Sequence, residues 1–185
     1  MRILRNPVNW AAFVALAIAV LCLLTNSHPA GVRSAAVMTA RFSGLLFAIA
    51  LAAHAPRLAW LHARRVGLTF AFVAAHGVHF ATVLGLALAD SESDFHNLKP
   101  ATFLSFAVGF SMVGCLALTT RGLSRPARIT HGILFYATWA LFTLAFFSGR
   151  RALASAAMAA MMVVVMGARI GLALWHAPRE QAAGA

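Results

Sequence analysis

The chain has 185 residues and a mean hydropathy of +0.83; 62% of its residues are hydrophobic and 10% are charged. Soluble domains carry about 25% charged residues, so this composition excludes a soluble globular protein. The net charge of +11 would indicate nucleic-acid binding in a soluble protein. Here the arginines flank apolar segments, where they set topology and meet anionic lipid. We therefore expect a lipid bilayer as the partner, with no nucleic acid and no flavin or nicotinamide domain in this chain.

Six apolar blocks follow one another along the chain, each near the ~20 residues that cross a hydrocarbon core. They predict an all-α integral membrane protein, a six-transmembrane-helix bundle that forms one domain over residues 1–185. The first block follows Arg2 and Arg5 as in a signal peptide, but no small-residue cleavage pattern comes after it, so we interpret it as a helix. The predicted helices span residues 10–24, 35–55, 66–89, 101–120, 127–147 and 152–175.

Basic residues are distributed unevenly between the two sides of these helices. The positive-inside rule places the richer side, which holds both termini, in the cytoplasm. The preference for Arg over Lys and the Ala-rich helices indicate a bacterial protein of the inner (plasma) membrane, crossing it several times. The side of the termini has nine basic residues (Arg2, Arg5, Arg57, Arg64, Arg65, Arg121, Arg125, Arg128 and Arg179) and the other has four (Arg33, Lys99, Arg150 and Arg151).

Histidines inside the predicted helices are the most informative ionisable residues, because such groups are costly at membrane depth unless they are paired or used. His76 and His79 lie three residues apart and share one helical face. They come ten and thirteen residues after Val66, about 15 and about 20 Å along the predicted helix. His131 lies near the start of the predicted helix over residues 127–147. The remaining histidines fall in loops or at interfaces and receive no role: His28, His54, His62, His96 and His176.

Two neutral imidazoles from facing helices are the usual axial ligands of a b-type heme in a helical bundle. The helices that carry His76 and His131 run in the same direction, so these side chains can meet across the bundle core. We predict a b-type heme, with His76 and His131 as ligands of the heme iron; His79 is then a spare, a group that supports the ligand, or the alternate ligand in a tilted arrangement. The competing interpretation is that each histidine is a hydrogen-bonded polar residue without a cofactor.

Arginines near the helix ends are candidates for pairing with the heme propionates. Arg128 and Arg169 lie on the predicted cytoplasmic side, together with Arg125, and Arg41 lies on the outer side. Snorkelling to the interface is the alternative for Arg41 and Arg169. No acidic residue falls within a predicted span, which argues against a proton-coupled pump.

Three segments carry a resemblance to a known family. Their order and spacing resemble the ferric reductase-like transmembrane domain, over roughly residues 35–147. That family includes the heme-binding membrane subunit of the bacterial methionine sulfoxide reductase system and the membrane core of NADPH oxidases. The segments are Arg41-Phe-Ser-Gly44-Leu-Leu-Phe-Ala, the basic turn Ala63-Arg64-Arg65-Val-Gly67-Leu68 leading into Phe70-Ala-Phe72-Val-Ala-Ala-His76, and Arg128-Ile-Thr-His131-Gly-Ile-Leu-Phe135-Tyr136.

The resemblance implies a six-helix bundle that binds heme between its third and fifth helices and passes electrons across the membrane. In the family each of those helices often holds two histidines about thirteen residues apart, but here Ala89 and Leu144 stand at the second positions. The expectation is therefore one inner heme in the membrane electron-transfer subunit of an oxidoreductase. Its donor would be a cytoplasmic flavoprotein or quinol, and its acceptor an extracytoplasmic redox partner. The alternatives are a cofactor-free assembly or interaction subunit and, third, a small-molecule transporter.

Overall fold

The structure is a computed structural model that describes residues 6–28, 30–55, 58–89, 100–121, 124–148 and 153–174. Within these ranges all the regular elements are helices, so the predicted all-α class is confirmed. The helices are α1 (Pro7–Thr25), α2 (Ala30–Ala53), α3 (Ala59–His62), α4 (Arg65–Ala89), α5 (Pro100–Thr119), α6 (Arg125–Ser148) and α7 (Leu153–Leu174).

Five of the described helices, α1, α2, α4, α6 and α7, are long and apolar enough to cross a membrane, and α5 adds a shorter apolar stretch over Ala107–Thr119. Many large apolar side chains point away from the protein, and Leu118 is 84% exposed. Soluble monomers rarely expose apolar surface on this scale. The fold is therefore that of a helical membrane protein.

The helix boundaries follow the predicted ranges with two notable differences. Helix α2 begins at Ala30, before the predicted residue 35. The short helix α3 interrupts the basic segment that was predicted to be a plain loop, and His62 Nδ1 within it lies 3.1 Å from the Ala53 carbonyl oxygen. Helix α1 has Pro7 in its first turn, and the Asn6 side chain caps the helix by accepting a hydrogen bond from the Val8 N–H.

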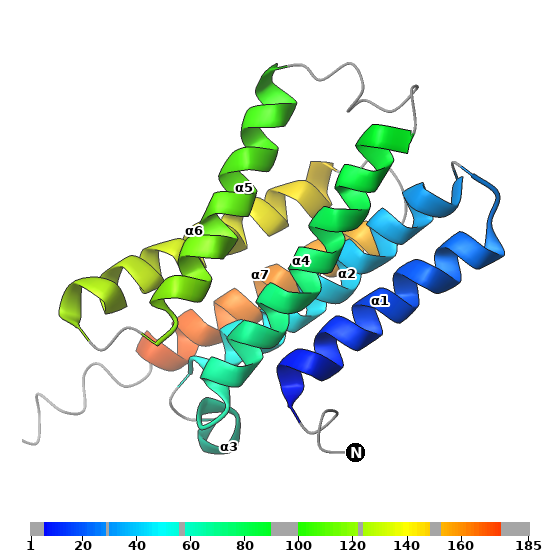
Figure 1. Cartoon of the computed structure of the whole chain (residues 1–185). Helices are drawn as coiled ribbons and strands as arrows, with labels where there is room; N and C mark the ends of the chain where they lie inside the picture. The colour runs from blue at the N-terminus through cyan, green and yellow to red at the C-terminus, as the bar shows by residue number, and fades with distance from the viewer. Residues whose placement is uncertain are drawn as a thin grey trace, which may run out of the picture.

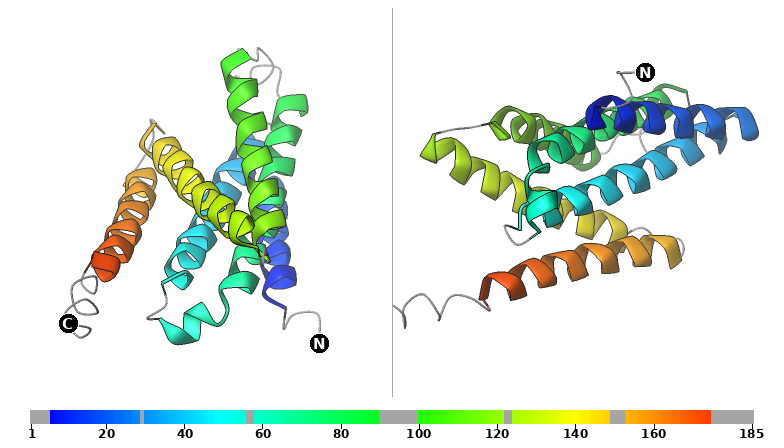
Figure 2. Two further views of the ribbon diagram at one scale, coloured as in Figure 1. Left: turned by 90° about the vertical axis from the view of Figure 1, so that its left-hand side faces the viewer. Right: turned by 90° about the horizontal axis from the view of Figure 1, so that it is seen from below.

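The helices form two groups, which are visible in Figure 1. Helices α1, α2 and α4 pack against one another, while α6 packs between α5 and α7, and α7 also contacts α2. Figure 2 shows α6 crossing obliquely past the first group. The end of α2 and the beginning of α6 lie close together, since His54 contacts His131 there. His54, just after α2, and His131, near the start of α6, therefore lie at the same level of the bundle.

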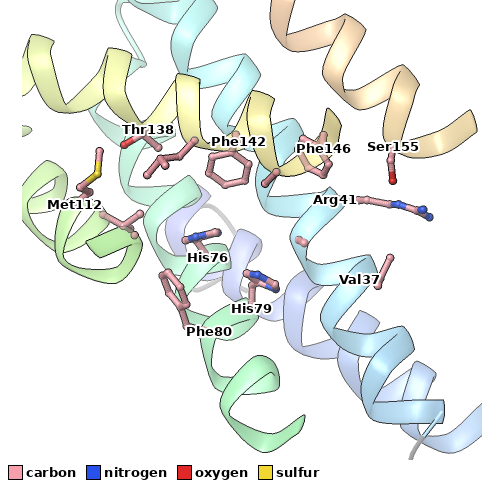
Figure 3. A pocket seen from close by; sticks show the side chains of 15 residues that line it. Val37, Arg41, His76, His79, Phe80, Met112, Thr138, Phe142, Phe146 and Ser155 are labelled. Atoms are coloured by element: carbon pink, nitrogen blue, oxygen red, sulfur yellow. The ribbon is translucent and has the colours of Figure 1, made fainter. Parts of the chain in front are cut away.

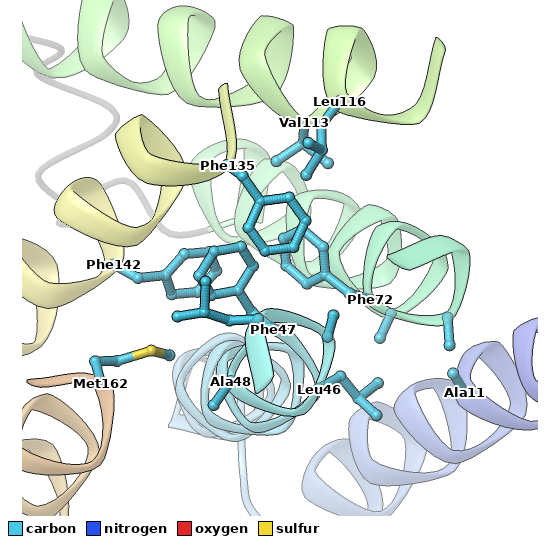
Figure 4. Packing of buried hydrophobic residues seen from close by; sticks show 14 of the residues in the cluster. Ala11, Leu46, Phe47, Ala48, Phe72, Val113, Leu116, Phe135, Phe142 and Met162 are labelled. Carbon is cyan, nitrogen blue, oxygen red and sulfur yellow. The ribbon is translucent and has the colours of Figure 1, made fainter. Parts of the chain in front are cut away.

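Aromatic rings fill the space where α2, α4 and α6 face one another (Figure 4). The Phe47 ring from α2 stacks on Phe135 at 5.1 Å and on Phe142 at 5.5 Å, both from α6, and meets the edge of Phe72 from α4 at 5.0 Å. Phe47 and Phe72 are fully buried. Offset and edge-on ring pairs add roughly 0.5–1.5 kcal/mol each beyond the area they bury. This cluster, Phe47, Phe72, Phe135 and Phe142, joins the two groups of helices.

Gly44 on α2 lets α6 and α7 approach closely. A Cβ atom at this position would lie 3.0 Å from both Met158 Cε and Phe146 Cζ. We expect Gly44→Val to lower the free energy of unfolding by about 1–3 kcal/mol through overpacking, measured by thermal unfolding in detergent. Gly114→Val is the matched control, because a Cβ there meets nothing within 4 Å. Equal effects of the two substitutions would contradict this packing.

Candidate functional site

His76 and His79 lie side by side on α4, as the three-residue spacing predicted. Their ring centroids are 5.2 Å apart. His76 is buried, with 7% of its surface exposed, and His79 is half-buried. The His76 ring also contacts Phe80 at 4.4 Å and Phe142 at 5.1 Å. Both imidazoles thus lie in an apolar, largely aromatic environment that disfavours a charged ring.

The hydrogen bonds of His76 favour one tautomer. Its Nδ1 lies 3.0 Å from the Ser43 hydroxyl oxygen on α2, and that hydroxyl is itself 3.0 Å from the Ala40 carbonyl oxygen. A carbonyl can only accept, so Ser43 donates its single proton to Ala40 and accepts from His76. The proton of the neutral His76 ring is therefore on Nδ1, and Nε2 carries a free lone pair.

His79 is held in the same way one turn further along α4. Its Nδ1 lies 3.3 Å from the hydroxyl oxygen of Thr39, which donates to the Ala35 carbonyl at 2.7 Å. Thr39 and Ser43 are both fully buried in α2. Metal-ligating histidines characteristically donate their second ring N–H to an oxygen acceptor, which orients the ring and leaves the other nitrogen for the metal. His76 and His79 both have this arrangement.

An apolar pocket of about 420 Å³ adjoins the two histidines (Figure 3). Cofactor and ligand sites commonly measure about 300–1,000 Å³. Thr138 on α6 also lines the pocket; its hydroxyl oxygen is buried and has no hydrogen-bond partner within the described part of the chain. Such an atom is costly to bury unless something in the pocket pairs with it. The side chains that line the pocket include Arg41, His76, His79, Phe80, Met112, Thr138, Phe142 and Phe146.

The predicted arginines are placed differently from one another. Arg41 lines the pocket. Arg128 is exposed at the start of α6. The Arg169 guanidinium lies 5.2 Å from the Tyr136 ring centre and 3.5 Å from the Leu51 carbonyl oxygen, away from the pocket lining. Of the three, Arg41 is therefore the one that lines the same pocket as the two histidines of α4.

His131 lies at another level of the bundle from His76. The His76 ring contacts Phe142, which is eleven residues after His131 on α6, a rise of about 16 Å. The structure thus does not bring the predicted pair His76 and His131 together. Each remains a predicted ligand, but a single iron between the two would require a rearrangement of α6.

His131 instead faces His54, a residue to which the sequence assigned no role. Their Nε2 atoms are 3.4 Å apart and their ring centroids 5.5 Å apart, so the rings meet tip to tip. His54 Nδ1 lies 2.8 Å from the Ala50 carbonyl oxygen, and His131 Nδ1 lies 3.2 Å from the Thr119 hydroxyl, which donates to the Cys115 carbonyl at 2.8 Å. The carbonyl partner places the His54 proton on Nδ1, and His131 carries its proton on Nδ1 as long as Thr119 donates to Cys115; two Nε2 lone pairs then face one another.

The environment keeps His54 neutral. The pKa of His54 is lowered to about 4, mainly by burial and further by the neighbouring His131, Arg169 and Arg65, against the opposing effect of the hydrogen bond to the Ala50 carbonyl. The unperturbed pKa of histidine is about 6.5. The ring is thus uncharged at neutral pH and its Nε2 is available as a ligand.

Sequence reasoning missed His54 because it follows the last residue of α2 and was interpreted as an interfacial residue. It also missed the hydroxyl partners Ser43, Thr39 and Thr119. The available signal was the order of the helices: α2 ends at the same side of the bundle where α6 begins, which places His54 and His131 at one level.

Removing the acceptor of His76 tests this hydrogen bond. We expect Ser43→Ala to leave the buried Nδ1–H unpaired and to lower the free energy of unfolding by about 1–3 kcal/mol. Thermal unfolding in detergent measures the effect. Ser111→Ala, at an exposed position of α5, serves as the control and should change stability little. A Ser43→Ala variant as stable as the control would contradict the assigned bond.

No protein-family model, no characterised protein and no solved structure matches the chain.

Proposed function

We propose that this chain is a b-type heme-binding electron-transfer subunit of a membrane oxidoreductase, with the heme in the pocket beside His76. The observation that carries the proposal is that the Nδ1 atoms of His76 and His79 lie 3.0 and 3.3 Å from the hydroxyl oxygens of Ser43 and Thr39, which donate to backbone carbonyls and so can accept from the rings. Both are thereby neutral imidazoles with an unprotonated Nε2 next to an apolar pocket of cofactor size. Iron needs such a nitrogen as its axial ligand.

The residues around the pocket fit a heme in three respects. Phe80, Phe142 and Phe146 provide apolar and aromatic surface for a flat macrocycle. Arg41 provides a cation for a heme propionate. Such a pair would also offset the cost of a partly buried arginine in a membrane protein. Thr138 offers a buried hydroxyl that lacks a partner among the described residues. A bound heme would supply one-electron redox chemistry, and the protein would set its potential through the ligands and the polarity of the pocket.

His76 is the proposed iron ligand and His79 its alternate. Among the other side chains of the pocket, Met112 on α5 offers a thioether, and a Met/His pair is an established form of heme ligation that raises the potential. Arg41 takes the role of propionate partner for which the sequence had favoured Arg128 and Arg169. The positions of those two arginines give this proposal no support.

The proposed setting is a six-span bundle with both termini in the cytoplasm of a bacterial cell. Helix α5 would be the sixth span beside the five apolar helices, and the positive-inside rule supports the orientation. The donor would be a cytoplasmic flavoprotein or quinol, and the acceptor a redox partner on the outer side. The resemblance to ferric reductase-like domains supports the same function. In this proposal the pocket beside His76 would hold the single heme of a bundle that lacks the family's outer histidine pair.

The visible spectrum tests the heme. Protein purified in mild detergent from heme-replete cells should show a b-type α-band in the dithionite-reduced minus oxidised spectrum. His76→Asn should abolish that band, because Asn can keep the donor to Ser43 while the iron-binding Nε2 is lost. His79→Asn should leave the band in place. Loss of the band in His79→Asn but not in His76→Asn would identify His79 as the ligand.

The controls decide between this function and a cofactor-free assembly subunit. Phe110→Leu, at an exposed position on α5, should keep the full band. Absence of a b-type band from a folded, monodisperse wild-type protein would contradict the proposed function. So would a band that survives in the double variant His76→Asn, His79→Asn.

A further inference from the structure

The pair His54–His131 is a second candidate site, separate from the pocket. Its Nε2···Nε2 distance of 3.4 Å is longer than the 2.7–3.2 Å of N–H···O hydrogen bonds. Moreover, both Nδ1 atoms have oxygen acceptors, the Ala50 carbonyl and the Thr119 hydroxyl. A hydrogen bond between the two Nε2 atoms would require His131 to carry its proton on Nε2, with the Thr119 hydroxyl turning from the Cys115 carbonyl to donate to His131 Nδ1. Two lone pairs facing each other are more naturally joined by a cation.

The surroundings of the pair do not leave room for a porphyrin. The Phe135 ring centroid lies 4.5 Å from the His54 ring and 5.4 Å from the His131 ring. These distances put Phe135, a buried residue, directly beside the gap between the two Nε2 atoms. A porphyrin with its iron in that gap would extend outward on all sides of the line that joins the two Nε2 atoms. One of those sides is occupied by the Phe135 ring. A bare ion needs only the gap itself.

The ligand set restricts which ion can bind. Imidazole nitrogens suit zinc, copper, iron and nickel. Structural and catalytic zinc sites use three or four protein ligands, but the described residues contain no group of three or more His, Cys, Asp or Glu that could hold a metal ion. Monovalent copper, a d¹⁰ ion, accepts two nitrogen ligands in a line. Opening the pair from 3.4 Å to about 4 Å would allow two bonds of ~2.0 Å.

Charge favours the same choice. Arg169 brings a positive charge near His54, since its guanidinium lies 3.5 Å from the carbonyl oxygen of Leu51, three residues before His54. The repulsion that this charge exerts grows with the charge of the bound ion. Nearby carboxylates, which would offset a divalent charge, are not found among the described residues at this end of the bundle, where α2 ends and α6 begins. A singly charged ion is therefore the better match.

We propose that His54 and His131 form a two-coordinate site for monovalent copper at the end of the bundle where α2 ends and α6 begins. The two Nε2 atoms are the ligands. The Ala50 carbonyl and the Thr119 hydroxyl orient the rings through their Nδ1–H groups, as oxygen acceptors do at established metal sites. The site is independent of the heme proposal, since it shares neither of the histidines that line the pocket.

A competition titration tests the site. The full chain in mild detergent is titrated anaerobically with Cu(I) against a chromophoric Cu(I) chelator, and the bound metal is counted by elemental analysis. We expect one Cu(I) per chain. His54→Asn and His131→Asn should each weaken binding at least about tenfold, because Asn retains a donor at the Nδ1 position and lacks Nε2. Ser111→Ala, at an exposed position of α5, is the control and should leave Cu(I) binding unchanged.

Three further measurements make the outcome decisive. X-ray absorption at the copper edge should show two nitrogen neighbours and no sulfur. Ag(I), a singly charged ion with the same linear preference and no accessible redox change, should compete for the site. Size-exclusion chromatography establishes that the His54→Asn and His131→Asn proteins are folded.

Three results would overturn the copper proposal. Failure of the folded wild-type protein to bind Cu(I) would mean that the pair is a hydrogen bond only. Equal binding by wild type and the His54→Asn and His131→Asn variants would place copper elsewhere. Loss of the heme α-band in those variants would assign the pair to heme. Failure of the heme proposal is seen separately, in the His76→Asn spectrum.

Discussion

Donation of an imidazole Nδ1–H to a helix-borne oxygen is the interaction on which the candidate sites depend. It occurs at His76 with Ser43, at His79 with Thr39, at His54 with the Ala50 carbonyl and at His131 with Thr119. In an apolar interior this bond performs two tasks. It satisfies a polar group that would otherwise be costly to bury, and it fixes the tautomer so that Nε2 is the free nitrogen. The hydroxyls can accept because each donates its own proton to a carbonyl of the preceding helical turn.

The aromatic cluster connects the two histidine levels. The rings follow one another from His54 to Phe135 at 4.5 Å, Phe135 to Phe47 at 5.1 Å, Phe47 to Phe142 at 5.5 Å and Phe142 to His76 at 5.1 Å. The same rings hold α2, α4 and α6 together, so the packing that stabilises the fold also sets the separation of the sites. A substitution at Phe47 would therefore change both the free energy of unfolding and the separation of the two sites.

Much of the fold could be predicted from the sequence because apolar block length and basic flanks respond directly to the bilayer. The shared face of His76 and His79 follows from helical periodicity alone. Pairing between helices could not be predicted in the same way. It depends on how far each helix is shifted along its neighbour, which is set by packing such as the contact of Gly44 with Met158 and Phe146. For that reason the sequence matched His131 with His76, whereas the structure places it against His54.

The protonation state of the ring nitrogens is the central claim, and nitrogen NMR of the protein labelled with ¹⁵N-histidine measures it directly. At neutral pH, before addition of metal or heme, His54, His76, His79 and His131 should all show the neutral tautomer with the proton on Nδ1 and a bare Nε2. Single histidine substitutions assign the signals. An Nε2–H tautomer at His76 would contradict the heme proposal, and one at either His54 or His131 would turn their contact into a simple hydrogen bond.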